Sequence, residues 1–124
     1  MAPDDKQRLT PYFTVKHADE FVTFVRNVFK ADLFKEDRQS DGTIQHARLS
    51  IGGSVIMLNE ASDDYQPNQS QLHLYVDSIE QTYALALEQG ATSLMEPNLR
   101  PHGDRMAGFK DPFGNIWWVA EEAG

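Results

Sequence analysis

The segment that decides the fold is GDRMAGFKDPFGNIWWVAEE, residues 103–122. Within it, DPFGN at positions 111–115 predicts a turn, because Pro112 presets φ and Gly114 can adopt a positive φ. The residues on both sides of this turn are rich in the aromatic and β-branched types that favour strands. The segment therefore predicts a β-hairpin with a five-residue connection.

An earlier segment, HARLSIGGSVIMLNE at residues 46–60, repeats this pattern. The offset between the two is 60 residues before the turn and 61 after it. A period of about half the chain predicts a duplicated unit. The matched pairs include Ala47 with Ala107, Leu58 with Val119, and Glu60 with Glu121.

Each half of the chain predicts the order strand, helix and three strands, written βαβββ. In the first half, strands are expected over residues 9–15, 33–38, 43–51 and 54–59, and a helix over 19–30. In the second half, strands are expected over 71–76, 91–95, 105–109 and 115–120.

The helix of the second half is expected to begin at Asp77 or Ser78 and to stop at Gly90. Glu80 is expected to complete a capping box with Asp77. The expected apolar stripe of this helix consists of Ile79, Tyr83, Ala86 and Leu87.

Residues 61–70, ASDDYQPNQS, form a polar linker between a first module at about 9–60 and a second at 71–122. The linker is predicted to be a mobile loop, with a lid over a ligand site as the alternative. The 124 residues suffice for one core but not for two independent ones. We therefore expect a single domain over residues 1–124.

Composition limits the function classes. The formal net charge of −8 argues against nucleic acid, which requires clustered Lys and Arg, and suits either plain solubility or a cationic ligand. Because there is no cysteine, disulfides and thiolate chemistry are excluded. Neither a membrane-spanning apolar run nor an apolar signal segment is visible, so a cytoplasmic location is the expectation.

Strict alternation in the predicted strands assigns each side chain to one of two faces. One face is apolar in each half and should pack against the helix. It consists of Leu9, Phe13, Val15, Ala47, Leu49, Ile51, Ile56 and Leu58 in the first half, and of Leu72, Leu74, Val76, Ala107, Phe109, Trp117 and Val119 in the second. The opposite face mixes aromatic and polar groups, as ligand sites do, although a half-exposed or dimer-buried sheet would look similar.

These features resemble the vicinal oxygen chelate superfamily of glyoxalases, bleomycin resistance proteins and extradiol dioxygenases. The resemblance lies in TPYFTV, HARLSIGGSVIMLNE, LHLYVD and GDRMAGFKDPFGNIWW, and covers nearly the whole chain. It is closest to the glyoxalase/bleomycin-resistance-like branch. It implies an α+β fold of two tandem βαβββ modules that form a cup-shaped mixed sheet with the helices outside, and often a homodimer.

Metal-dependent members of the superfamily place ligands on the first and last strands of each module. The matching positions here hold Thr10, Met57, Gln71 and Trp118. These side chains are not the imidazole and carboxylate ligands of such a divalent metal. We therefore expect no metal, no other cofactor and no catalytic residue.

The sequence thus predicts a homodimeric protein that binds a planar or cationic small molecule and, because the metal ligands are missing, does not catalyse a reaction. The alternative is a glyoxalase-like lyase or isomerase, with either a shifted metal site at His46, His73 and Glu60 or a His acid–base such as His73. His17 is expected to be a surface or helix-capping residue, and His102 a solvated loop residue, with closure over a ligand as the alternative for His102. The expected ligand contacts are Tyr12, His46, Arg48, Met57, Gln71, His73, Tyr75, Met106 and Trp118.

Overall fold

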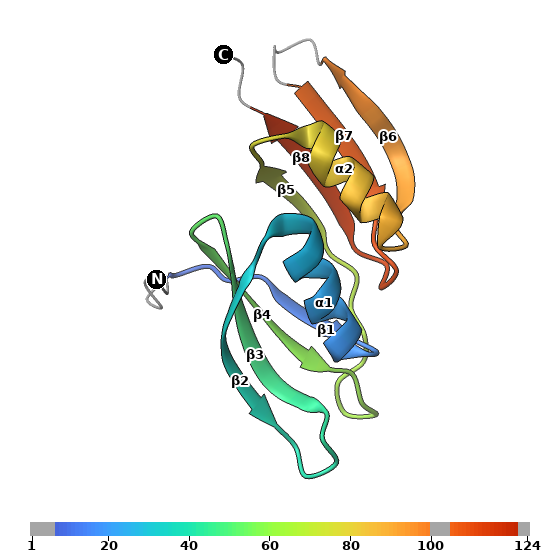
Figure 1. The fold of residues 1–124 in the computed structure, drawn as a ribbon. Helices are drawn as coiled ribbons and strands as arrows, with labels where there is room; N and C mark the ends of the chain where they lie inside the picture. Colours follow the sequence, from blue (N-terminus) through green and yellow to red (C-terminus); the bar gives the residue numbers. More distant parts are fainter. Residues whose placement is uncertain (1–6, 100–104, 122–124) are drawn as a thin grey trace. The chain divides into compact units, whose positions relative to one another are not determined.

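The computed structural model describes residues 7–99 and 105–121. By its internal contacts the chain divides into two compact units, Met1–Asn68 and Gln69–Gly124. Each unit contains one helix and one four-stranded mixed sheet (Figure 1). The predicted α+β class and the two tandem βαβββ modules are therefore confirmed.

The first unit forms a sheet of order β1-β4-β3-β2. Strand β1 pairs with β4 in parallel, and the other neighbours pair antiparallel. The elements are β1 (Tyr12–Val15), α1 (Ala18–Phe29), β2 (Asp32–Arg38), β3 (Ile44–Ile51) and β4 (Ser54–Glu60).

The second unit repeats this topology in the order β5-β8-β7-β6, again with one parallel pair, β5 with β8. Neither helix that the structure describes has the length and apolar character needed to cross a bilayer. The elements are β5 (Gln71–Tyr75), α2 (Ile79–Glu88), β6 (Thr92–Leu99), β7 (Arg105–Lys110) and β8 (Ile116–Glu121).

In each unit the helix lies against one face of its own sheet (Figure 1), and the core fills the space between them. Phe13 of β1 meets Phe21 of α1 with ring centroids 5.0 Å apart, and both side chains are fully buried. Trp117 is 1% exposed in the second unit. The predicted apolar faces therefore pack largely as expected.

Two expectations for the first strand were wrong. Strand β1 begins at Tyr12 rather than at residue 9, and Leu9 is 85% exposed instead of joining the apolar face. Pro11 precedes the strand, lacks an N–H group and contributes only its carbonyl, which accepts a hydrogen bond from the Met57 amide at 2.9 Å.

The expected surface of helix α2 also needs correction. Ser78 is the N-cap, its Oγ accepts a hydrogen bond from the Gln81 amide at 3.2 Å, and Glu80 pairs with Arg105 instead of forming a capping box. The buried positions of this helix are Ile79, Thr82 and Ala86. The predicted stripe residues Tyr83 and Leu87 are instead half-buried and exposed, respectively.

Strand β6 is longer than predicted, because it continues through Pro97 to Leu99. A proline ordinarily interrupts a ladder. Here β6 is an edge strand, and its register with β7 shifts between Met95 and Asn98, so that Pro97 lies in an irregularity where no ladder hydrogen bond is required.

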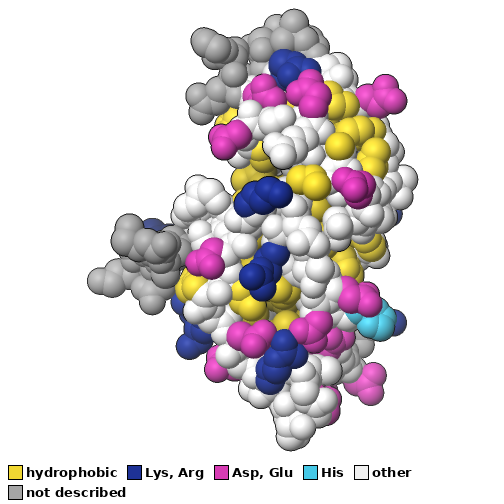
Figure 2. Space-filling model, in the orientation of Figure 1, with side chains coloured by type: hydrophobic (Ala, Val, Ile, Leu, Met, Phe, Trp, Pro, Cys, Tyr) yellow, Lys and Arg dark blue, Asp and Glu magenta, His cyan; other side chains and the backbone are white. Residues whose placement is uncertain are grey.

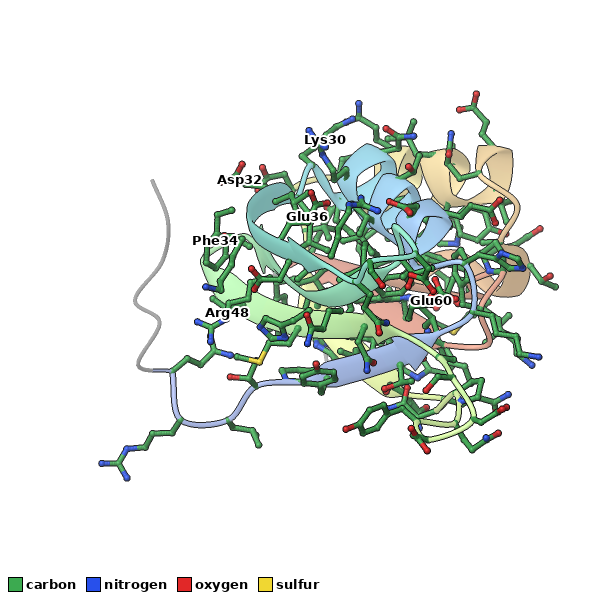
Figure 3. All side chains as sticks on the ribbon, turned by 90° about the horizontal axis from the view of Figure 1, so that it is seen from below. Lys30, Asp32, Phe34, Glu36, Arg48 and Glu60 are labelled. Carbon is green, nitrogen blue, oxygen red and sulfur yellow. The ribbon has the colours of Figure 1, made fainter. Side chains whose placement is uncertain are left out.

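The duplicated glutamates at the ends of β4 and β8 hold the helix N-termini. The two carboxylate oxygens of Glu60 accept hydrogen bonds from the His17 and Ala18 amides, each at 2.9 Å. Glu121 accepts one from the Ile79 amide at 2.7 Å. Figure 3 labels Glu60 close to helix α1. Each unit therefore anchors its helix to its own last strand.

Candidate functional site

The face of the first sheet that α1 does not cover carries a hollow of about 730 Å³. Its lining mixes aromatic, amide and charged side chains from all four strands of the first sheet and from the linker, as expected for a ligand site. The first-unit hollow is lined by Tyr12, Thr14, Asp37, Arg38, Gln45, His46, Asn59 and Tyr65.

A chain of three hydrogen-bonded side chains forms one wall of the hollow. The Nε group of Arg48 donates to His46 Nε2 at 3.3 Å, and His46 Nδ1 lies 3.2 Å from the Tyr12 hydroxyl. Because a guanidinium can only donate, His46 Nε2 must accept, which leaves the ring proton of the neutral imidazole on Nδ1. Nδ1–H therefore donates to Tyr12, and the hydroxyl proton of Tyr12 is free to point elsewhere.

The charge state of this wall follows from its surroundings. Burial lowers the pKa of His46 below its ordinary value, and the positive charge of Arg48 lowers it further, while Asp37 opposes this. Burial also raises the pKa of Tyr12. Both effects favour a neutral imidazole beside a neutral phenol at pH 7.

Asn59 is the most unusual polar residue of the hollow. Its side chain is 9% exposed, and its Oδ1 atom has no hydrogen-bond partner among the described residues. Strand β4 places it next to Thr14 of β1, on the face opposite α1. A buried carbonyl oxygen without a donor is uncommon in folded proteins and needs an explanation.

Charged groups at the hollow are unequally engaged. Arg38 donates to the Gly42 carbonyl at 2.7 Å and forms ion pairs with Asp19 at 2.7 Å and Glu36 at 2.9 Å. Within residues 7–99 and 105–121, the carboxylate of Asp37 makes no hydrogen bond or ion pair at close range. Acidic side chains are visible on both units (Figure 2).

The linker contributes to this site. Asn68 donates through its amide nitrogen to the Tyr12 carbonyl at 2.9 Å and accepts from the Thr14 amide at 3.0 Å. These bonds fasten the linker along β1, the edge strand of the sheet. Tyr65 from the same linker lines the hollow. The segment therefore forms part of the wall, and a lid over the site, the alternative to the predicted mobile loop, stays a prediction.

The second unit carries its own group of predicted contacts on the face away from α2. Trp118 Nε1 donates to Gln71 Oε1 at 2.6 Å. The indole ring lies against Gly108, where an added Cβ atom would collide with it. The rings of His73 and Tyr75 meet edge to face with centroids 5.0 Å apart. Met106, on β7, is half-buried.

The positions that hold metal in relatives do not fit a divalent ion here. Gln71 and Trp118 bond to each other, and Met57 and Thr10 offer neither imidazole nor carboxylate. The two oxygens of Glu60, a possible ligand of a shifted site, are engaged with helix α1. No group of three or more His, Cys, Asp or Glu suited to a metal ion occurs within the described residues.

The predicted contacts thus form two groups, one in each unit. Tyr12, His46, Arg48 and Met57 lie on neighbouring strands of the first sheet, and Arg48 and Met57 are direct cross-strand partners. The register of β2 with β3 shifts between Leu33 and Lys35 and again between Asp37 and Arg38. The register of β3 with β4 has no shift, so Arg48 shares the face of Met57 as predicted. In Figure 3 the side chains of Arg48 and Glu60 are well separated. His102 lies outside the described residues.

The predicted contacts include two of the eight residues that line the hollow, Tyr12 and His46. The six that sequence reasoning missed are Thr14, Asp37, Arg38, Gln45, Asn59 and Tyr65. One signal was available for Asn59, because its repeat partner, 61 residues later, is Ala120. A polar residue at a position that is apolar in the other copy of the repeat indicates that its own module needs the polar group.

The model of the Glyoxalase/Bleomycin resistance protein/Dioxygenase superfamily matches residues 9–119. The chain belongs to this superfamily. The match spans both modules, and so agrees with the duplicated βαβββ fold.

This chain is similar to several proteins of other organisms. An uncharacterized protein of Mycobacterium bovis is 28% identical over 98% of this chain and 87% of that protein. The crystal structure of TioX from Micromonospora sp. ML1 shares 21% identity and a TM-score of 0.73, covering 91% of this chain and 98% of that one. A superfamily member from Sphaerobacter thermophilus shares 21% identity and a TM-score of 0.72, covering 91% and 94%. At these identities the two structures support the fold alone.

Proposed function

We propose that this superfamily member is a small-molecule-binding protein, similar to bleomycin resistance proteins, that sequesters a planar or cationic ligand. The observation that carries the proposal is the first-unit hollow, whose 730 Å³ would accommodate a drug-sized molecule. Its aromatic side chains, Tyr12, His46 and Tyr65, supply surfaces for a planar ligand.

The polar groups of the hollow favour binding over catalysis. Both ring nitrogens of His46 are engaged, one with Arg48 and one with Tyr12, so neither is available to take a proton from a substrate. Sequestration requires no such group. The alternative of a glyoxalase-like lyase or isomerase with a His acid–base is therefore less well supported, although His73 stays a candidate for that role.

The second-unit residues Gln71, His73, Tyr75, Met106 and Trp118 remain proposed ligand contacts. Trp118, held against Gly108, offers an aromatic surface for stacking. A homodimer, a cytoplasmic location and a single domain over residues 1–124 likewise remain proposals.

Native mass spectrometry of protein purified without chelator, together with elemental analysis, tests the proposal. We expect a metal-free dimer, with a co-purified organic molecule in part of the population. About one divalent metal per chain would contradict the binding proposal and favour the metal-dependent enzyme.

A further inference from the structure

We propose that the ligand of the first-unit hollow presents an N–H donor to Asn59 Oδ1, which makes Asn59 the specificity-determining residue. This inference rests on the proposed function, since it names the chemistry that the same hollow selects. Asn59 is 9% exposed and lines the hollow, and its Oδ1 atom is unpartnered. A desolvated carbonyl without a donor is unfavourable in the free protein. The Oδ1 atom is shielded in this conformation, so a ligand N–H group would remove the cost once the Asn59 amide turns towards the hollow.

The repeat shows that the fold does not require an amide at this position. The equivalent residue of the second unit is Ala120, 61 positions later, at 0% exposure in the equivalent strand β8. Both residues lie directly before the glutamate that holds the helix of their unit. A small apolar side chain is therefore compatible with the position, and the amide of Asn59 has a role beyond folding.

The neighbouring groups favour the same ligand chemistry. The Asp37 carboxylate, which has no close partner among the described residues, is a second acceptor at the hollow. The guanidinium of Arg38 is occupied by two carboxylates, and Arg48 directs its Nε group to His46. The hollow thus offers one buried acceptor without a donor, at Asn59, and one exposed carboxylate, at Asp37, whereas the guanidinium of Arg38 is held in ion pairs. Amidines, guanidines and amines fit this arrangement better than carboxylates do.

Three small probes of nearly the same planar shape separate donor chemistry from shape. Benzamidine carries a charged N–H donor group, benzamide a neutral one, and benzoate only acceptors. We expect assigned amide resonances around Asn59 and Asp37 to shift most strongly with benzamidine, whose affinity should exceed that of benzoate by about tenfold or more. Equal or tighter binding of benzoate in the hollow would overturn the inference while leaving the proposed function intact.

Two variants assign the preference to Asn59. Asn59→Ala should reduce benzamidine affinity by about threefold or more and leave benzoate affinity unchanged, without lowering the melting temperature, because it removes an unpartnered acceptor while Asp37 stays in place. Asn59→Asp should restore or increase the preference by supplying a charged acceptor. Asn98→Ala, the same change on exposed strand β6, is the matched control and should leave binding unchanged.

The remaining outcomes are equally informative. A preference for benzamidine that is unchanged in Asn59→Ala would overturn the role of Asn59, although a ligand site in the hollow would stand. If none of the three probes shifts resonances of the hollow at millimolar concentration, the proposed function itself fails together with the inference.

Discussion

At the scale of single residues, His46 illustrates how neighbours decide the behaviour of a side chain. The chain contains four histidines, and His46 is one that the strand alternation places on the mixed face. In the structure Arg48 occupies its Nε2 atom and Tyr12 receives its Nδ1 proton. A protonated imidazole has no acceptor, so protonation would break the hydrogen bond from Arg48.

The lowered pKa of His46 predicts a pH-dependent stability. Between its lowered pKa and the ordinary value of about 6.5, the unfolded chain binds more protons than the folded protein. The His46 contribution is therefore complete above the ordinary value and is lost as pH falls through this interval. Urea unfolding at several pH values should show that the free energy of unfolding falls less in His46→Gln than in the wild type. A constant difference between the two proteins across this range would contradict the prediction.

At the scale of elements, helix α1 depends on a residue from another element. Its N-cap, His17, has φ 64° and makes no side-chain capping hydrogen bond. Glu60 of β4 replaces the missing cap by accepting the amides of His17 and Ala18. A carboxylate at a helix N-terminus also interacts favourably with the helix dipole. These two hydrogen bonds thereby fix the N-terminus of α1 to the end of β4.

Removing this carboxylate should weaken the first unit. We expect Glu60→Ala to lower the free energy of unfolding by about 1–2 kcal/mol, since two backbone N–H groups lose their acceptor. Chemical denaturation measures the change. Glu20→Ala, in the exposed first turn of α1, removes the same charge without a capping hydrogen bond and should cost only a few tenths of a kcal/mol. Equal losses in both variants would show that charge rather than capping is responsible.

At the scale of the whole molecule, the duplicated chain raises the question of cooperativity. The larger unit spans 68 residues, Met1–Asn68, and the smaller one is Gln69–Gly124. A domain below roughly 70–80 residues without disulfides or metal rarely gains more than about 3–5 kcal/mol from its core. Separate units of this size would be marginally stable, which favours a single cooperative domain.

We therefore expect one unfolding transition in urea. Trp117 and Trp118, the two tryptophans of the chain, both lie in the second unit, so tryptophan fluorescence reports on that unit. Far-UV circular dichroism reports on helices and strands of both units. The two midpoints should coincide. A fluorescence transition displaced from the dichroism transition would mean that the units unfold independently.

Residue types and their spacing were enough to predict the turns, the strands and the duplicated modules of this protein. The turn around Asp111, the repeat offset and the alternation of strand residues predicted two βαβββ modules and placed Phe13 and Trp117 in the core, because these features depend on residue type and period alone. The sequence did not predict the correct ends of two edge strands that have a proline at or near them. Leu9, before Pro11, lies outside β1 and is exposed, and β6 continues through Pro97.

Which polar groups have hydrogen-bond partners became clear from the folded structure alone. It showed that Glu60 holds a helix, that Trp118 bonds to Gln71, and that Asn59 Oδ1 has no partner among the described residues. A hydrogen bond joins atoms that chain folding brings together from distant positions, and desolvation depends on everything packed around a group. Neither property is encoded in a local pattern, so the candidate site became visible only in the folded chain.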